Sequence, residues 1–413
     1  MKLIASPVEN LFKPVKTVSG IVERNQSLPV ISNILIEQKD ESVTFSTTDL
    51  DIQIRTSAPV GVSGAEGTFT VSAQKTSEIL AALRPLDVVE IDVGEDGLAA
   101  FSVSGGRFTV QTLPPEDFPV IKTQTPVSSF TLPAKTLRYL LTMTSFAMAA
   151  KDIRYYLMGV LLVAQGSKLR AVATDTHRLA YCEAVVDGMM QDEKVEAIVP
   201  RKTVRELMRI LPEDDSPVVV NLGDTQICFK FDNVEFISKL IEGKFPDYQR
   251  VMPTEDTNPQ CVRLNREELL LALRRVQILT NEKFHGMRWL FKEGELLIQG
   301  NNAEQEEASQ TIHAPWTWGE LDIGFNLLYM IELLTNLKNS EVDFHFAPTP
   351  KRPGHDAGIF QLPLPHHADE NLSSPFATEA HSVRECASPR PFFDSHPTSI
   401  RPLHSVCPGE AKD

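Results

Sequence analysis

The chain has 413 residues, of which 42% are hydrophobic, and a formal net charge of −15 at pH 7. This length predicts about three domains, and the apolar content suffices for ordinary globular cores. An acidic surface repels phosphate, so a uniformly spread charge would exclude nucleic acid as a partner. No apolar run is long enough to predict a membrane span.

The predicted elements begin with a helix over 10–23, three strands, and a second helix over 72–83 that Ser72 caps and Pro85 ends. Alternation of apolar residues predicts strands over 31–37, 43–47, 51–56, 88–93, 99–103 and 107–112. Later helices are predicted over 134–150, 201–211, 266–279 and 326–337. Strands with paired helices are typical of α+β domains, in which helices cover one face of an antiparallel sheet.

Short motifs recur about 127 residues apart along this order. The matches are Thr48-Asp49 with Thr174-Asp175, Lys75-Thr76 with Lys202-Thr203, and Phe118-Pro119 with Phe245-Pro246. So long a period indicates repeated whole domains, since solenoid repeats run at roughly 20–50 residues. We predict domains over 1–126, 127–256 and 257–347, with boundaries in the polar segments 122–129 and 253–260. Three alike domains suggest a body that surrounds or lines something.

The composition changes at residue 348, in the middle of the third repeat. The last 66 residues hold 11 of the 28 prolines and 6 of the 10 histidines. We interpret 348–413 as a disordered tail, so the third domain is expected to lose strands and to expose a sheet edge. A reading-frame change in the gene is another explanation. His366-His367 lacks the spacing of metal ligands, and no metal site is predicted.

Positive charge gathers on the predicted helices. At about 100° per residue, one helix places its cations in a single arc and its apolar residues in another. The cations are Arg201, Lys202, Arg205 and Arg209; the apolar residues are Val204, Leu207, Met208 and Leu211. Other helices carry Lys13 and Lys16, Lys75 and Arg84, Lys135 and Arg138, and Arg274 and Arg275. They form either ordinary solvated helix surface or one basic track inside an acidic shell.

Motifs of catalysis are missing from the sequence. It has no phosphate-binding GxxxxGK[ST] loop, no GxGxxG, no HExxH and no GxSxG. Asp175 and His177 could face one side of a strand end, which leaves a metal-dependent hydrolase as an alternative. The first repeat lacks this histidine, so Asp175 is more simply a turn residue that binds backbone amides. We predict neither an enzyme nor a cofactor.

The cysteines and the N-terminus bear on the compartment. The five cysteines form neither a CxxC pair nor a zinc spacing: Cys182, Cys228, Cys261, Cys386 and Cys407. Isolated thiols suit a reducing compartment. Residues 1–7 contain too short an apolar run for a signal peptide. These features predict a cytoplasmic protein.

Several segments resemble the bacterial DNA polymerase III beta subunits, the beta sliding clamps. They are 154–157, 173–179, 199–202, 244–248, 281–284, 302–308 and 323–326, and the similarity runs from Met1 to about Phe346. The resemblance implies a head-to-tail homodimer of three-domain subunits that closes a ring. Helices would line the central hole, and antiparallel sheets would form the outside.

The function that the resemblance implies is that of a non-catalytic processivity factor, cytoplasmic and nucleoid-associated. It would encircle double-stranded DNA without regard to sequence, and tether the replicative polymerase, the clamp loader and repair polymerases through short peptide motifs. The implied DNA contacts and lining are Arg24, Lys75, Lys151, Arg154, Tyr155, Tyr156, Arg201, Lys202, Arg205 and Arg209. Sheet packing is the alternative for the two tyrosines.

The resemblance also implies a peptide pocket between the second and third domains. Its residues would be Leu157, Thr174, His177, Arg178, Leu179, Pro246, Arg250, Val251, Asn326 and Tyr329. Thr176 replaces the family's usual glycine, and nothing after 348 matches the family's C-terminal segment, which forms one pocket wall. We therefore expect weaker partner docking and a less stable third domain.

The implied dimer interface joins the first domain of one subunit to the third domain of the other. Its residues would be Arg107, Phe108, Val110, Ile278 and Leu279, for which burial in the core is the alternative. Two other functions remain open: a peptide-binding scaffold that does not encircle DNA, and a clamp copy impaired in partner binding by its altered C-terminus.

Overall fold

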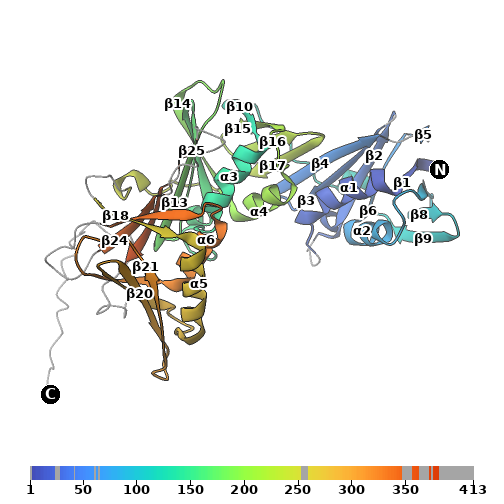
Figure 1. Cartoon of the computed structure of the whole chain (residues 1–413). Coiled ribbons are helices and arrows are strands. Elements are labelled where there is room, and N and C mark those ends of the chain that lie inside the picture. The colour runs from blue at the N-terminus through green and yellow to red at the C-terminus, as the bar shows by residue number, and fades with distance from the viewer. Residues whose placement is uncertain are drawn as a thin grey trace, which may run out of the picture.

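The computed structural model describes residues 2–23, 28–40, 42–59, 62–63, 66–252, 259–346, 356–361, 372–373 and 375–380. Its elements form three units in chain order, from blue to orange in Figure 1. Apart from two-residue strands, each unit repeats the order strand, helix, four strands, helix and three strands. The predicted α+β class and the threefold repeat are confirmed.

The elements of each unit have the following bounds. The first unit holds β1 (Lys2–Pro7), α1 (Val8–Val18), β2 (Asn33–Lys39), β3 (Ser42–Thr48), β4 (Ile52–Pro59), β5 (Val62–Ser63), β6 (Gly67–Ser72), α2 (Ala73–Ala81), β7 (Val88–Val93), β8 (Leu98–Val103) and β9 (Gly106–Gln111). The second holds β10 (Ser128–Pro133), α3 (Ala134–Ser145), β11 (Gly159–Gly166), β12 (Lys168–Thr174), β13 (Arg178–Val185), β14 (Gln191–Pro200), α4 (Arg201–Ile210), β15 (Pro217–Leu222), β16 (Gln226–Phe231) and β17 (Val234–Lys239). The third holds β18 (Gln260–Asn265), α5 (Arg266–Val276), β19 (Gly286–Lys292), β20 (Glu295–Asn301), β21 (Glu307–His313), β22 (Leu321–Asn326), α6 (Leu327–Asn336), β23 (Glu341–Phe346), β24 (Asp356–Gln361), β25 (Leu372–Ser373) and β26 (Pro375–Ala380).

Two of the sheets run across the junctions between units. One has the order β10-β15-β16-β17-β4-β3-β2-β6, where β17 pairs with β4 and Phe236 lies opposite Ile54. The other has the order β14-β11-β12-β13-β26-β24-β23-β18, where β26 pairs with β13 and Leu179 lies opposite Ala377. The remaining sheets, β5-β1-β7-β8-β9 and β21-β20-β19-β22, stand at the two ends of this series.

The helices pack in pairs within each unit, α1 on α2, α3 on α4 and α5 on α6. The predicted cap of α2 is confirmed, because Ser72 Oγ accepts a hydrogen bond from Lys75 N at 3.4 Å. Asn265 and Asn326 cap α5 and α6 in the same way. The predicted helices over 10–23 and 134–150 were too long: the α-helical hydrogen bonding ends at Val18 and Ser145.

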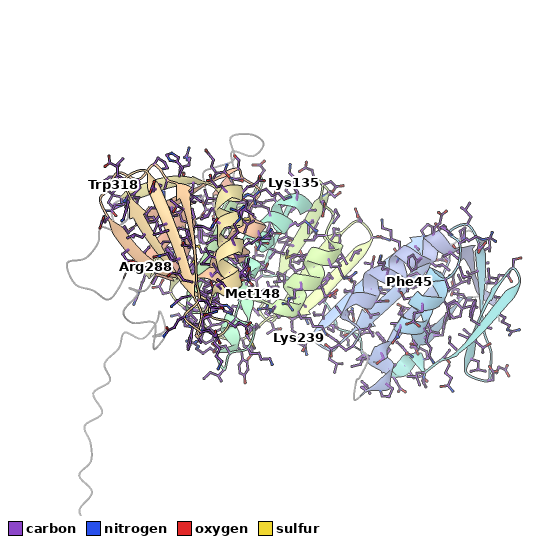
Figure 2. All side chains as sticks on the ribbon, turned by 60° about the horizontal axis from the view of Figure 1, so that its bottom comes forward. Phe45, Lys135, Met148, Lys239, Arg288 and Trp318 are labelled. Carbon is purple, nitrogen blue, oxygen red and sulfur yellow. The ribbon has the colours of Figure 1, made fainter. Side chains whose placement is uncertain are left out.

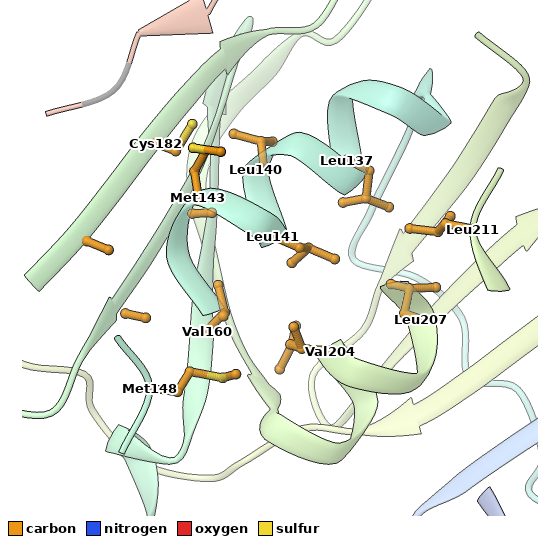
Figure 3. Close-up of a cluster of buried hydrophobic side chains, with 14 of the residues drawn as sticks. Leu137, Leu140, Leu141, Met143, Met148, Val160, Cys182, Val204, Leu207 and Leu211 are labelled. Carbon is orange, nitrogen blue, oxygen red and sulfur yellow. The ribbon is translucent and has the colours of Figure 1, made fainter. Parts of the chain in front are cut away.

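Apolar side chains at helical spacing fill the space between helices and sheet. Figure 3 shows Leu137 and Leu141 of α3 facing Val204 and Leu207 of α4, with Val160 of β11 among them; all of these are buried. Val204 and Leu207 belong to the arc of apolar residues that was predicted for the helix at 201–211, and both face the core. The polar arc of α4 is consequently turned away from the core.

Aromatic rings pack against one another in the third unit's part of the core. The Trp289 ring lies 4.9 Å from Phe325, 5.4 Å from Phe344 and 6.0 Å from Phe291, centroid to centroid. All four side chains are buried, and all precede residue 347.

The expectation of an exposed sheet edge on the third unit was wrong. Strands β24 and β26 belong to the segment that we interpreted as a disordered tail, and they lie in the sheet between β23 and β13. They take the places that β16 and β17 have in the second unit. The alternation rule failed because both strands are short and lie in a segment rich in proline and histidine, whereas the existing edges of the sheet can hold them.

No helix among the described residues is long and apolar enough to cross a membrane.

Candidate functional site

Two turns of identical design stand at the two junctions between units. In the first unit, Thr48 Oγ1 donates to Ile52 O at 2.9 Å, and Asp49 Oδ1 accepts from Ile52 N at 2.6 Å. In the second, Thr174 Oγ1 donates to Arg178 O at 2.7 Å, and Asp175 Oδ1 accepts from the backbone N–H of Arg178 at 3.0 Å. The interpretation of Thr-Asp as a turn is confirmed. In both turns the second carboxylate oxygen of the aspartate binds a cationic side chain, Lys202 at Asp49 and Arg178 at Asp175.

The third residue of each turn has a left-handed backbone. The φ angle is 78° at Leu50 and 76° at Thr176. Side chains with a branched Cβ are strained in this region, which is why glycine is favoured there. Thr176 thus keeps the turn in spite of the substitution, at the cost of local strain.

Arg178 joins three elements at the junction of the second and third units. Its Nε lies 3.0 Å from Asp175 Oδ2, and its Nη1 lies 2.6 Å from Glu332 Oε2 on α6. Its Nη2 donates to Phe146 O at 2.6 Å, and its Cζ lies 4.2 Å from the centroid of the Tyr329 ring. The side chain is only 8% exposed, so these charge-assisted hydrogen bonds operate with little water around them.

The other predicted pocket residues lie on three segments. Thr174, His177 and Leu179 share the turn and the start of β13 with Arg178, while Asn326 and Tyr329 begin α6. Pro246, Arg250 and Val251 lie after β17, and Val251 packs against the apolar cluster that contains Leu179. Leu157 is fully buried beside α3, where its carbonyl accepts from Ala149 N. Arg178 itself connects the turn to α6; Arg250 is 81% exposed and pairs with Asp247.

An apolar cluster covers one face of the sheet formed by β14, β11, β12 and β13, beside this turn. Its buried members are Leu161, Val163, Val172, Leu179, Ile198, Phe245 and Tyr248. Tyr248 is 4% exposed, and its hydroxyl has no hydrogen-bond partner among the described residues. Burial is the main reason that the pKa of Tyr248 is raised. An apolar surface with a few polar groups at its rim is what a short peptide needs for docking.

The four cations of α4 have different surroundings. Arg201 Nη1 donates to Met148 O at 2.9 Å, and Lys202 and Arg209 reach across to the first unit. Arg205 is exposed, and no carboxylate within the described residues pairs with it. The same junction includes Lys239, which Figure 2 labels where the second unit meets the first. Its Nζ lies 3.0 Å from Asp51 Oδ1.

The remaining candidates for DNA contact are mostly exposed. Lys75 and Lys151 are exposed, while Arg154 is half-buried in a two-point ion pair with Asp152. Tyr155 is 68% exposed, which argues against packing on the sheet for this side chain. Tyr156 packs against the apolar cluster of the second sheet, so the packing alternative holds there. Arg24 lies outside the described residues.

The predicted interface residues lie on β9 and in the short turn of helix after α5. Arg107, Phe108 and Val110 belong to β9, the outermost strand of the first end sheet; Arg107 and Phe108 are exposed, but Val110 is buried. Ile278, after α5, is 78% exposed, and Leu279 is half-buried. Core burial therefore accounts for Val110 only.

The carboxylate of Asp175 is fully engaged. Its oxygens accept from the backbone N–H groups of His177 and Arg178 and from the Arg178 side chain. Among the described residues, no group of three His, Cys, Asp or Glu side chains could hold a metal ion. A hydrolase centred on Asp175 and His177 gains no support from this geometry.

The acidic partners of the junction cations were not predicted from the sequence. Glu23, Asp49 and Glu332 hold Lys202 and Arg178, yet they lie 179, 153 and 154 residues away from these cations in the chain. The sequence signal that bears on them is the repeat, which places acidic residues at equivalent positions of α4 and α6. Glu332 is the sixth residue of α6, as Glu206 is of α4.

The fold and its junctions define a class of protein: a series of three alike α+β units whose sheets join edge to edge and whose end strands stay open for another copy. Family models match the chain in three parts: the N-terminal domain of the DNA polymerase III beta subunit over residues 1–122, the central domain over 131–247 and the C-terminal domain over 249–353.

Individual relatives agree with these matches. The beta sliding clamp of Pseudomonas aeruginosa is 40% identical over 337 residues, which cover 81% of this chain and 90% of that protein. The beta sliding clamp of Escherichia coli is 38% identical over 336 residues, again 81% and 90%. The crystal structure of a Pseudomonas aeruginosa sliding clamp bound to griselimycin matches with a TM-score of 0.86 and 34% identity, over 92% of this chain and 100% of that one. A Bartonella birtlesii clamp bound to griselimycin matches with a TM-score of 0.82 and 30% identity, over 93% and 100%. The chain belongs to the DNA polymerase III beta subunit family, the beta sliding clamps.

Proposed function

We propose that two copies of this chain close a ring around duplex DNA and tether the replicative polymerase and other partners to it. The observation that carries the proposal is the edge-to-edge pattern of the units. Strand β17 ends the second unit and pairs with β4 of the first. Strand β26 ends the third unit and pairs with β13 of the second. By the repeat, β9 corresponds to β17 and β26, and β21 corresponds to β4 and β13.

Pairing of β9 with β21 of a second copy would continue this pattern around a closed circle of six units. Both strands are the outermost of their sheets, and an open edge of this kind favours strand addition. The two sides also differ in charge, because β9 exposes Arg107 while Glu304, Glu306 and Glu307 are exposed at and before β21. Phe108 and Ile278 supply exposed apolar surface, and the proposed interface set is Arg107, Phe108, Val110, Ile278 and Leu279.

The proposed DNA-facing set comprises cations and aromatic side chains on one series of helices and loops. Its candidates are Arg24, Lys75, Lys151, Arg154, Tyr155, Tyr156, Arg201, Lys202, Arg205 and Arg209. Of these, Tyr156, Lys202 and Arg209 also make contacts within the chain that compete with this role. Contacts of this type are made to phosphates and do not depend on base sequence. A closed ring needs only weak contacts of this kind, because its topology prevents escape and weak contacts permit sliding.

The proposed peptide site surrounds Arg178 at the junction of the second and third units. The turn at 174–179 and the start of α6 supply its polar rim, and the apolar cluster of Leu179 and Tyr248 supplies its floor. Because nothing after residue 348 resembles the family's C-terminal segment in sequence, we expect a polymerase-derived motif peptide to bind more weakly than to the Pseudomonas aeruginosa clamp. Calorimetric titration of both proteins measures the difference, and equal affinities would contradict the expectation.

We infer that the protein acts without catalysis or a bound cofactor, in the cytoplasm and at the nucleoid. Encircling DNA requires no chemical step. The Asp175 carboxylate, the main candidate for catalysis, instead stabilises a turn and binds the Arg178 side chain.

Retention on circular DNA tests the proposed function. The protein is loaded onto nicked circles by a bacterial clamp loader with ATP and is separated from free protein by gel filtration. We expect it to stay on the circles at moderate salt and to be lost once a restriction enzyme linearises them, because a ring slides off a free end. Phe108→Asp, which places a charge in the proposed interface, should abolish retention. Equal retention on circles and linear DNA would contradict encirclement.

A further inference from the structure

Three of the four cations of α4 divide into two groups with different tasks; the fourth, Arg201, binds Met148 O within its own unit. We propose that Lys202 and Arg209 are positioning residues that fix the second unit against the first, and that Arg205 is the α4 cation that meets the polyanion. The proposal rests on the proposed function in one respect, because α4 must face DNA for Arg205 to bind it. The positioning role of Lys202 and Arg209 stands on contacts within the chain.

Lys202 is held by two carboxylates of the first unit. Its Nζ lies 2.6 Å from Glu23 Oε1 and 2.6 Å from Asp49 Oδ2. Asp49 is rigid, since its side chain is 8% exposed and its Oδ1 accepts the backbone N–H groups of Asp51 and Ile52. Burial lowers the pKa of Lys202, but the hydrogen bonds to Asp49 and Glu23 outweigh burial and raise it above its ordinary value. The ammonium group is therefore a fixed part of the junction.

Arg209 closes the C-terminal end of α1. Its Nη2 donates to Thr17 O at 2.8 Å and its Nη1 to Lys16 O at 3.4 Å, while Glu206 Oε2 holds its Nε at 2.8 Å. Carbonyl groups in the last turn of a helix lack partners within the helix and carry partial negative charge. A guanidinium from the second unit thus completes a helix of the first.

Gly20 lies directly against the Glu206–Arg209 pair. A Cβ atom at Gly20 would overlap the guanidinium of Arg209 and the carboxylate of Glu206. The φ angle of Gly20 is not left-handed, so its backbone conformation does not require glycine. Space for the Glu206–Arg209 pair is the reason that the structure offers for glycine at this position.

The second junction repeats the design with reversed charge. There the cation, Arg178, stands on the turn, and the acid, Glu332, stands on α6 at the place that Glu206 has in α4. In both junctions an ion pair connects the aspartate-containing turn of one unit with the second helix of the next. Its recurrence with different residues indicates that the link itself, rather than the sign of the charge, is what the junction needs.

The two groups should respond differently to phosphate. Salt dependence of DNA binding arises from release of mobile counterions. The counterions of Lys202 are Asp49 and Glu23, which are fixed and cannot be released. A phosphate at Arg205 replaces mobile ions, so each phosphate bound there contributes about 0.9 to the slope of log K against log salt.

Two measurements on the full-length protein test the division. The first is the salt slope of binding to duplex DNA for Arg205→Ala, Asp49→Asn and Lys202→Met. We expect Arg205→Ala to lower the slope by about 0.9 for each phosphate that the arginine binds in the wild-type protein. Asp49→Asn should leave it unchanged, and Lys202→Met should lower it by less than half as much as Arg205→Ala.

The second measurement is hydrogen exchange in the strand pair β17–β4, which joins the two units, with the pair β10–β15 inside the second unit as reference. Lys202→Met and Asp49→Asn should each speed exchange in β17–β4 by about fivefold. The double variant should do no more than Lys202→Met alone, because that substitution already breaks the Lys202–Asp49 link. Lys202→Arg should restore much of the protection, and Arg205→Ala should not change it. Should Asp49→Asn fail to fold, Lys202→Met and Lys202→Arg suffice.

The proposal is overturned if Lys202→Met lowers the salt slope as much as Arg205→Ala and leaves exchange in β17–β4 unchanged. Failure of the proposed function has a different signature: the wild-type protein is not retained on circular DNA and no variant alters the salt slope, while the exchange of β17–β4 still reports on positioning.

Discussion

The junction between the first and second units and the junction between the second and third units share one design but depend on different parts of the chain. At the first, β17 and β4 pair, and Lys202, Arg209 and Lys239 bind groups of the neighbouring unit. At the second, β13 pairs with β26 from the C-terminal segment, and Arg178 binds Glu332. The first junction distributes its charge links over three half-exposed cations, whereas the second concentrates them in one buried arginine.

This difference predicts how each junction responds to substitution of a charged residue. Exposed ion pairs contribute little individually because water screens them, while loss of a buried ionic partner leaves an uncompensated charge. The first junction should therefore tolerate single substitutions, and the second should not. The second junction also needs β26, which lies beyond the residues that the family models match.

Removal of the tail strands should have the largest effect. A chain that ends at Phe346 lacks β24 and β26, so the sheet that joins β13 to β23 is divided. We expect the third unit to unfold at least about 8 °C lower, as a loss of about 2 kcal/mol gives in a domain of this size. Differential scanning calorimetry measures this shift.

A chain that ends at Ala380 is the matched control, because it keeps every described strand and should unfold like the full-length protein. Equal unfolding temperatures for the chain ending at Phe346 and for full-length protein would show that β24 and β26 carry no stability.

Arg178→Ala should have the next largest effect. It leaves Asp175 and Glu332 without their partner and removes the ring contact to Tyr329. We expect unfolding to become easier by about 3 kcal/mol, the order measured when one partner of a buried ion pair is removed. Urea unfolding measures it. Arg288→Ala, which breaks an ion pair exposed by 42% on both sides, should cost less than about 1 kcal/mol. A similar loss for both variants would contradict the assigned difference between buried and exposed links.

Thr176→Gly should stabilise the protein slightly. The left-handed backbone costs a non-glycine residue about 1–2 kcal/mol. Greater freedom of glycine in the unfolded chain offsets about 0.5–1 kcal/mol of this gain. We therefore expect an increase of about 1 kcal/mol in the free energy of unfolding, seen as a higher urea midpoint with unchanged slope. Leu50→Gly at the equivalent turn should act in the same direction, and destabilisation by both variants would disprove the strain.

The pH dependence of the Lys202 link should be the smallest effect. Because the pKa of Lys202 is raised in the folded chain, its contribution is complete below the unfolded pKa of about 10.4 and is lost as pH rises through the folded pKa. The difference in unfolding free energy between wild type and Lys202→Met, below about 1 kcal/mol, should be constant from about pH 6 to 9 and should shrink above about pH 10.5. A difference that vanishes near neutral pH would contradict the raised pKa.

Local periodicity was sufficient to predict the six helices and the arc of apolar residues in α4. The repeat located the turns at Thr48 and Thr174, because the same side-chain hydrogen bonds need the same residues in each unit. The partners of the cations could not be predicted, since Glu23 and Lys202 meet only after two units have packed. The strands β24 and β26 were missed for a related reason: a short strand is stabilised by the edge that receives it, and that edge belongs to β13 and β23.

Sedimentation equilibrium of the full-length protein tests the ring most directly. The account predicts a mass of twice 46.0 kDa at micromolar concentration. Phe108→Asp and Ile278→Asp should each give a monomer, and Met190→Asp, at an 85% exposed site of the second unit, should leave the dimer intact. A wild-type protein that stays monomeric, or a dimer that survives both interface substitutions, would contradict the account.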